Sequence, residues 1–206
     1  MRQIRSLSAE NTLFLILEGT LYLTFLSLDL SGRSGGTHWL KYAGILLCFV
    51  FALYRHSLPG APALAFSACA DWFLLVRGDH FLHGVLLFLC VQACHLLFLH
   101  RRGAGFALPL RLGLSGILLT VLALSGLADL LTIAAAIYLA QLISNIVVSR
   151  RIPSAGRLTV GLTMMLCCDI CVGIAYLSPL LPALLPAAQV GMWLFYLPSQ
   201  VLIAFA

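Results

Sequence analysis

Charged residues are scarce in this sequence. Only 9% of its 206 residues are Asp, Glu, Lys or Arg, against about a quarter in soluble domains. Acidic residues number seven against twelve basic ones, hydrophobic residues make up 62% of the chain, and the mean hydropathy is +1.05. This composition excludes a soluble domain and predicts one transmembrane domain over residues 1–206, multi-pass in the cell membrane.

Long polar loops are also missing, which leaves little room for chemistry outside a membrane. A span needs roughly 17 to 25 mostly apolar residues. Dividing the chain at its Gly, Pro and Arg clusters gives eight such segments: 11–30, 38–54, 61–77, 82–100, 106–125, 128–149, 157–178 and 183–206. The first lacks a small-residue cleavage site, so we interpret it as a retained helix. We therefore predict an all-α membrane protein, a polytopic bundle of about eight helices.

Arginines are rare on one side of the predicted membrane. The amino terminus and the even-numbered loops hold nine, against two on the other side. The nine are Arg2, Arg5, Arg55, Arg101, Arg102, Arg111, Arg150, Arg151 and Arg157, and the two are Arg33 and Arg77. Because positively charged loops stay cytoplasmic, both termini are expected in the cytoplasm. The net charge of +5 suits anionic lipid headgroups, and no nucleic-acid partner is expected.

Known cofactor motifs are absent as well. The seven cysteines lie in apolar runs and are expected to be free. The CxxC spacing of Cys168 and Cys171 lacks a second ligand pair, and the GLSG stretch at 113–116 has no histidine after it to act as a base. Asp79, His80 and His83 are more typical of a solvated loop than of a metal site. We expect no metal or organic cofactor.

Two aspartates interrupt this apolar background. Asp71 lies in LAFSACADWFLLV and Asp169 in TMMLCCDICVGIAY. A carboxylate in a membrane span is costly and is expected to face a protein interior or a water-filled cavity. The third and seventh segments run in the same direction, so both aspartates are predicted at similar depths in the outer half of the membrane. The matching positions of the aspartates in the third and seventh segments also suggest that the chain consists of two four-helix halves.

Other polar residues occur within the predicted spans. They are Glu18, Tyr22, Lys41, Gln92, His95, Tyr138, Gln141, Asn145, Gln189, Tyr196 and Gln200. Several share a helical face at three- and four-residue spacings, and such faces are expected to line an inward polar cavity. Lys41 either extends to the headgroups or pairs with a carboxylate or a lipid phosphate. His95 and Glu18 are equally compatible with interhelical hydrogen bonds and with a site role.

Three interpretations fit the aspartate pair. Neighbouring acids can share one proton, so that one acts as general acid and the other as base. The alternatives are buried carboxylates that stabilise helix packing, in a lipid-binding or structural protein, and a proton path in a small transporter or channel. Intramembrane acids are functional by default, so the residues alone favour an intramembrane acid/base centre.

The segments ALAFSACADWFLLV, FLHGVLLFLCVQACHLLFL, AAIYLAQL, LTMMLCCDICVGIAY and WLFYLPSQVLIAF resemble the YhhN family of eight-span membrane proteins. The resemblance runs from about Lys41 to the end of the chain. Its family residues correspond to Asp71, Asp169, Lys41, His95, Tyr138, Tyr196 and Gln200. The chain departs from the family pattern at Ala70 and Cys168, which precede the aspartates in place of glycine and serine, and at Tyr42, which replaces a proline.

The resemblance implies a lysoplasmalogenase, because characterised animal members of that family are such enzymes. A lysoplasmalogenase cleaves the vinyl-ether bond of a lysophospholipid and releases a fatty aldehyde and a glycerophospho-base. The resemblance assigns acid/base catalysis to Asp71 and Asp169. Substrate binding is expected from Lys41, His95, Tyr138, Tyr196 and Gln200. The expected partners are the lysophospholipid and membrane lipids, and no cofactor is required.

Overall fold

The computed structural model describes residues 8–33, 35–57, 60–177, 179 and 182–206. These residues form eight α-helices and no strand: α1 (Ala9–Leu30), α2 (Thr37–Tyr54), α3 (Gly60–Asp71), α4 (Phe81–Arg101), α5 (Leu108–Ser125), α6 (Leu130–Ser149), α7 (Gly156–Tyr176) and α8 (Leu185–Ala204). A π-helical segment, η1 (Trp72–Arg77), continues α3, and 3-10 turns η2 (Pro153–Ala155) and η3 (Pro182–Leu184) precede α7 and α8. The predicted all-α bundle of eight helices is confirmed.

The predicted third span is the one that differs in structure. Its α-helix stops at Asp71, and the chain continues as the π-helix to Arg77. Among the described residues, seven helices are long and apolar enough to cross a membrane. Helix α3 is shorter, and η1 continues it over the rest of the predicted third span. Each of the other predicted segments falls on one α-helix, because hydrophobic runs between Gly, Pro and Arg clusters set both ends.

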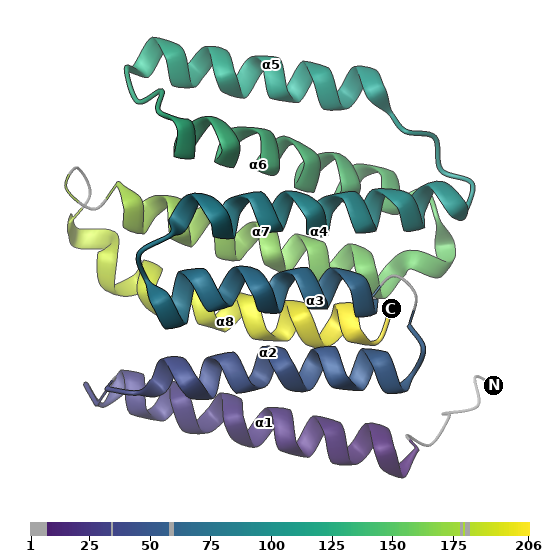
Figure 1. The fold of residues 1–206 in the computed structure, drawn as a ribbon, viewed down its shortest axis with the longest axis vertical. Helices are drawn as coiled ribbons and strands as arrows, with labels where there is room; N and C mark the ends of the chain where they lie inside the picture. The colour runs from purple at the N-terminus through teal and green to yellow at the C-terminus, as the bar shows by residue number, and fades with distance from the viewer. Residues whose placement is uncertain (1–7, 34, 58–59, 178, 180–181) are drawn as a thin grey trace.

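The helices lie side by side with α1 and α5 at opposite edges (Figure 1). Helix α2 follows α1, α4 lies between α3 and α6, and α7 and α8 pack on each other behind them. Gly161 permits the close approach of α7 and α8, since a Cβ there would lie 3.2 Å from the Ser199 carbonyl oxygen. Most buried residues lie on α2, α3, α4, α6, α7 and α8. Asp71 on α3 and Asp169 on α7 therefore both belong to the inner helices.

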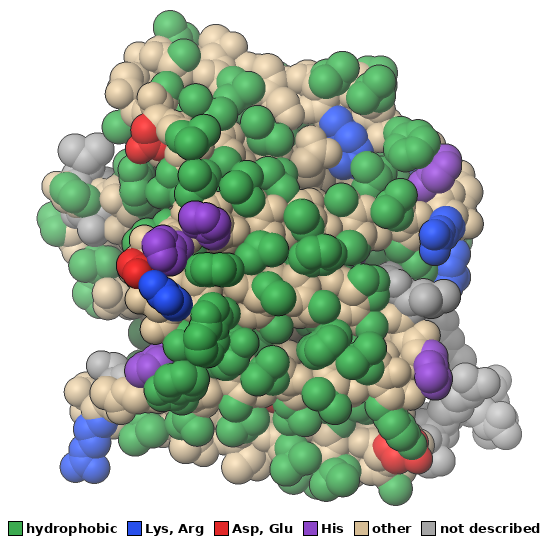
Figure 2. Space-filling view, in the orientation of Figure 1, with side chains coloured by type: hydrophobic (Ala, Val, Ile, Leu, Met, Phe, Trp, Pro, Cys, Tyr) green, Lys and Arg blue, Asp and Glu red, His purple; other side chains and the backbone are tan. Residues whose placement is uncertain are grey.

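On the face shown in Figure 2, hydrophobic side chains are spread over the whole length of the helices, and charged ones gather mainly near the helix ends. On the edge helix α5, Leu124 is 84% exposed. A surface of this kind is stable only in a lipid environment, because large apolar patches are unfavourable in water. The protein is a multi-pass membrane protein.

One end of the bundle is basic. Arg55, Arg101, Arg102, Arg150, Arg151 and Arg157 lie where α2, α4 and α6 end and where α7 begins. We call this the basic end, and the end with Asp29, Asp79 and Asp129 the opposite end. Helix α1 starts and α8 finishes at the basic end. Arg2 and Arg5 lie outside the described residues.

The count of loop arginines places Arg111 in a loop, but in the structure it lies in a helix. It sits one turn into α5 and is only 5% exposed. That part of the prediction is wrong, because amide side chains on α6 hold the guanidinium inside the bundle.

Candidate active site

Asp71 is the last residue of the α-helical part of its span. It is 3% exposed, and its Oδ2 accepts a hydrogen bond of 2.7 Å from the Tyr196 hydroxyl on α8. The π-helix starts at the next residue, Trp72. A π-helical turn widens the backbone locally, and such turns are frequent at functional sites. Asp71 therefore lies at a helix irregularity, with a phenol as its partner and no cation bound to it among the described residues.

Asp169 has a matching arrangement on α7. Its Oδ2 accepts a hydrogen bond of 2.8 Å from the Tyr138 hydroxyl on α6. The side chain is half-buried, so it is more accessible than Asp71. Each aspartate thus pairs with one tyrosine of a neighbouring helix.

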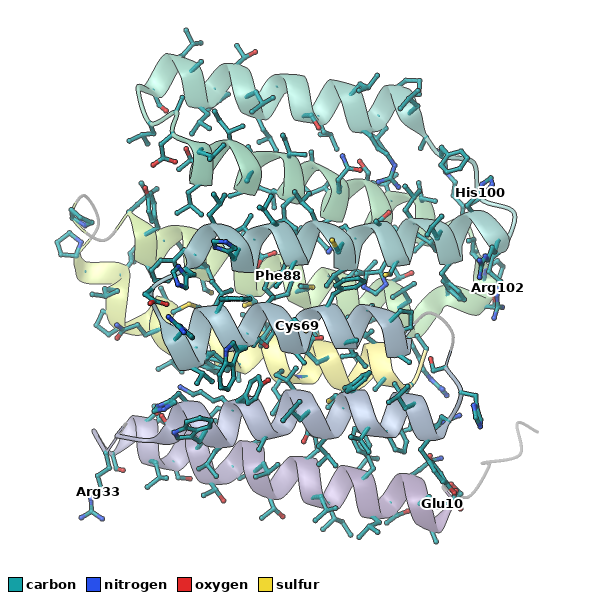
Figure 3. The ribbon with its side chains drawn as sticks, viewed as in Figure 1. Glu10, Arg33, Cys69, Phe88, His100 and Arg102 are labelled. Carbon is teal, nitrogen blue, oxygen red and sulfur yellow. The ribbon has the colours of Figure 1, made fainter. Side chains whose placement is uncertain are left out.

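The two pairs lie in one region of the interior. Cys168 interacts electrostatically with both carboxyl groups. The Phe88 ring on α4 lies 5.9 Å from the Tyr138 ring and 6.4 Å from the Tyr196 ring, near the middle of the bundle (Figure 3). We call Asp71, Asp169, Tyr138 and Tyr196 the carboxyl–tyrosine cluster. Within the described residues no hydrogen bond joins the two carboxyl groups directly, and each carboxyl group bonds to a different tyrosine.

Lys41 lies on α2 toward the opposite end of the bundle. Its Nζ is 2.6 Å from Asp29 Oδ2 and 4.3 Å from the centre of the Trp193 ring. The Trp193 ring in turn lies 5.9 Å from the Tyr196 ring. Of the alternatives for Lys41, the structure shows a carboxylate pair, one aromatic layer away from the cluster.

His95 and Gln200 are fully buried, but neither bonds to an aspartate. Both ring nitrogens of His95 and the Oε1 of Gln200 have no hydrogen-bond partner in the described structure. Gln200 Nε2 makes only a long contact of 3.4 Å to Ser199. Along their helices, Gln200 is one turn from Tyr196 and His95 about two turns from Phe88. Buried unpaired groups are rare, so these two can hydrogen-bond a water or a substrate group.

Arg111 belongs to a polar network that the sequence analysis missed. Its guanidinium donates hydrogen bonds of 2.7 Å to Gln141 Oε1 and to Asn145 Oδ1. Asn145 Nδ2 then donates to Gln92 Oε1 at 2.9 Å, and Gln92 lies beside Tyr138. The available signal was the stripe of Gln141 and Asn145, which requires a polar partner on a neighbouring helix. The network joins α5, α6 and α4 and borders the cluster.

The remaining polar residues do not form the single predicted cavity. Glu18 Oε1 accepts a hydrogen bond of 3.0 Å from the Cys48 thiol, while Glu18 Oε2 has no hydrogen-bond partner in the described structure. Gln189 is exposed, so its predicted inward orientation is wrong. Tyr42 interacts electrostatically with Asp71, a contact that was not predicted. The polar groups are divided among the cluster, the Arg111 network and isolated positions.

The loop at the opposite end resembles a solvated surface. Asp79 forms an ion pair of 3.3 Å with Arg77, and this hydrogen-bonded guanidinium lowers the pKa of the Asp79 carboxyl. The rings of His80 and His83 meet edge to face, with their centres 5.3 Å apart. No group of three or more metal-ligating side chains occurs in the described part of the chain. The seven cysteines are free, as predicted.

Comparison with known proteins gives one match. A model of the YhhN family matches residues 21–206, nearly the whole chain. No curated protein and no solved structure matches the chain.

Proposed function

This chain belongs to the YhhN family, and from that premise we propose that it is a lysoplasmalogenase-like hydrolase of the cell membrane. The observation that supports the proposal most directly is the carboxyl–tyrosine cluster, in which two aspartates from parallel spans share one apolar interior. Two carboxyl groups of this kind can supply the acid and the base for ether hydrolysis, as they do in glycoside hydrolysis.

The proposed reaction consumes one water. One aspartic acid, in its neutral form, donates a proton to the alkenyl carbon that is not bonded to oxygen, which leaves an oxocarbenium ion at the other alkenyl carbon. The second aspartate, as a carboxylate, stabilises this cation and takes a proton from the attacking water. The resulting hemiacetal collapses to a fatty aldehyde and a glycerophospho-base that carries a new hydroxyl group.

The tyrosines orient the two carboxyl groups in this proposal. Each phenol occupies one carboxyl oxygen at 2.7 or 2.8 Å, so the other oxygen remains for the substrate or the water. Lys41 is one aromatic layer away and is suited to pair with the substrate phosphate in exchange for Asp29. His95 and Gln200 offer their unpaired atoms, and the apolar helices hold the alkenyl chain.

Purified protein supplied with lysoplasmenylethanolamine in detergent tests the proposal. We expect wild type to release aldehyde, and Asp71→Asn and Asp169→Asn to lower the rate by about 10²-fold or more, the usual loss for a general acid or base. Asp79→Asn, in the exposed loop, is the matched control and should retain full activity. Folded variants that match wild type would contradict the proposal, and release by none of the proteins would favour a transporter or a lipid-binding protein.

A further inference from the structure

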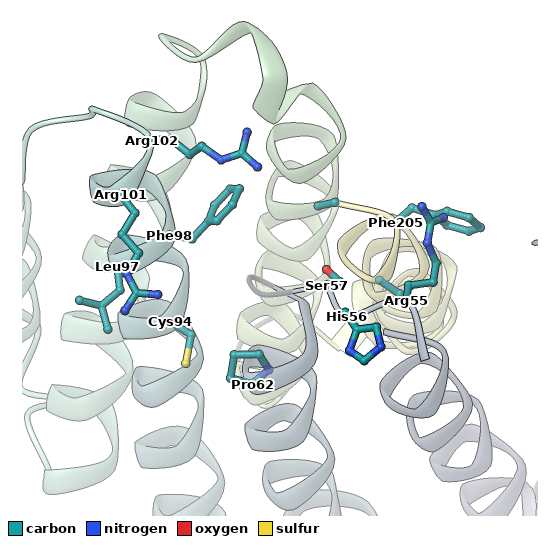
Figure 4. A pocket seen from close by; sticks show the side chains of 12 residues that line it. Arg55, His56, Ser57, Pro62, Cys94, Leu97, Phe98, Arg101, Arg102 and Phe205 are labelled. Atoms are coloured by element: carbon teal, nitrogen blue, oxygen red, sulfur yellow. The ribbon is translucent and has the colours of Figure 1, made fainter. Parts of the chain in front are cut away.

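A cavity of about 640 Å³ opens at the basic end, between the ends of α2, α3, α4 and α8. Arg101 and Arg102 extend from α4 on one side, and Arg55 lies across from them at the end of α2 (Figure 4). His56 also lines the cavity, and none of the described Asp and Glu side chains does. The cavity is therefore a concave site lined by positively charged arginines.

Neutral groups hold two of the three arginines, Arg55 and Arg102. Arg55 donates a 3.3 Å hydrogen bond to Asn11 and lies over the Phe205 ring at 5.5 Å. Arg102 donates to Ser154 at 3.2 Å and lies over the Phe98 ring at 4.9 Å. Such contacts fix a guanidinium without neutralising it.

Acidic groups do not compensate these charges. All three ion pairs of the described residues lie at the opposite end. Ala206 lines the cavity too, and no described arginine forms an ion pair with its carboxylate. The positive charge is thus available to a ligand.

The inner wall of the cavity is apolar. Pro62 from α3 and Cys94 and Leu97 from α4 form it, and Arg101 lies directly above them (Figure 4). Arginine binds phosphate with paired, charge-assisted hydrogen bonds. We infer that this cavity binds a phosphate group, with an attached apolar chain entering between α3 and α4.

This phosphate site is separate from the proposed reaction centre. Arg101 lies 13 residues beyond Phe88 on α4, or about 20 Å along the helix axis. The glycerol of a lysophospholipid joins phosphate and vinyl ether through only a few bonds, so one molecule does not reach both places. The cavity therefore takes a second phosphate-bearing molecule, and the inference stands independently of the proposed function.

Binding of phosphatidic acid to the purified full chain in detergent tests the inference, with diacylglycerol as the lipid without phosphate. The readout is the concentration dependence of ligand stabilisation in thermal unfolding. Wild type should bind phosphatidic acid, and Arg101→Gln with Arg102→Gln should weaken binding about tenfold or more through lost charge-assisted hydrogen bonds. The matched control is Arg150→Gln with Arg151→Gln, an exposed pair at the same end outside the cavity, which should change binding less than about twofold.

Two further arms distinguish the sources of phosphate. Leu97→Trp fills the apolar wall and keeps the arginines, so it should weaken phosphatidic acid without affecting inorganic phosphate. If inorganic phosphate binds as tightly as the lipid, and Leu97→Trp has no effect, the site takes free phosphate. Equal losses in both double variants, equal binding of diacylglycerol, or no binding of any probe to wild type would overturn the inference.

Discussion

At the residue scale, each aspartate depends on one phenol. Tyr196 and Tyr138 donate hydrogen bonds to Asp71 and Asp169, and both tyrosines are buried. A phenol that holds a carboxyl oxygen fixes the side-chain rotamer and directs the second oxygen. In this account the tyrosines are positioning residues, and the carboxyl groups carry the protons.

Removing one phenol hydroxyl should therefore slow the reaction without abolishing it. We expect Tyr138→Phe to lower aldehyde release by about tenfold, the value of one hydrogen bond to a charged group. A shifted pH profile of the rate is expected as well, because the carboxyl group loses its donor. Tyr176→Phe, which is 55% exposed at the end of α7, is the control. An unchanged rate and pH profile in Tyr138→Phe would show that the phenol has no positioning role.

The sequence predicted both aspartates and both tyrosines, but not how they pair. Composition identifies Asp71 and Asp169 as costly residues in apolar spans, and parallel spans predict similar depth. The tyrosine contacts cross from α3 to α8 and from α7 to α6, and no local pattern encodes such distant neighbours. The same reason explains why the Asp29 partner of Lys41 was not predicted.

At the element scale, polar contacts connect helices whose surfaces are otherwise apolar. The edge helix α5 packs on α6, and Arg111 is its only buried residue among those described. The spacing of the Gly, Pro and Arg clusters alone predicted the helix limits well, because the length of each hydrophobic run between them sets where a helix begins and ends. The change to π-helix after Asp71 was not predictable, since the apolar run WFLLV suits either helix type.

Arg111→Leu should loosen the attachment of α5. The substitution removes the donor to Gln141 and Asn145. It leaves the buried Asn145 oxygen unpaired, at a cost of about 1–3 kcal/mol, and the half-buried Gln141 oxygen unpaired at a smaller cost. We expect a lower unfolding temperature in detergent and faster proteolysis between α5 and α6. Arg150→Leu removes an exposed arginine and should have little effect. Equal stability of wild type and Arg111→Leu would mean that the network does not hold α5.

The start of α6 should show a pH-dependent contribution to stability. Asp129 accepts a 2.7 Å hydrogen bond from the Thr132 amide as a capping box, and this bond lowers the pKa of the carboxyl. Because the folded pKa is below the unfolded value of about 4, the stabilisation is fully present above pH 4 and disappears as the pH falls through the folded pKa.

We therefore expect Asp129→Ala to lower the unfolding temperature at pH 7 and to lower it less near pH 3. Asp129→Asn keeps a cap without a titrating group and should remove most of the pH dependence. A difference between wild type and Asp129→Ala that is constant from pH 7 to pH 3 would contradict the capping role.

At the scale of the whole molecule, charged residues lie at the two ends of the bundle, and the buried polar groups lie in separate places inside it. The basic end carries the phosphate cavity, and the carboxyl–tyrosine cluster lies deeper, with Lys41 toward the opposite end. The two four-helix halves stay a prediction. Asp169 pairs within its own half and Asp71 pairs across halves, so the tyrosines do not occupy equivalent positions.

The charge distribution predicts that the basic end faces the cytoplasm. Green fluorescent protein fused after Ala206 should then fluoresce in cells, whereas alkaline phosphatase at the same place should be inactive. The reverse result would place the cluster in the inner half of the membrane.

Isotope incorporation tests the central claim most directly, because the proposed first step forms a new carbon–hydrogen bond. Purified protein would act on lysoplasmenylethanolamine in D2O, and the aldehyde would be analysed at once by mass spectrometry. We predict a single deuterium on the carbon next to the aldehyde carbon, and no aldehyde above background with Asp71→Asn or Asp169→Asn. Aldehyde without deuterium, or full activity in folded aspartate variants, would contradict protonation by the carboxyl–tyrosine cluster.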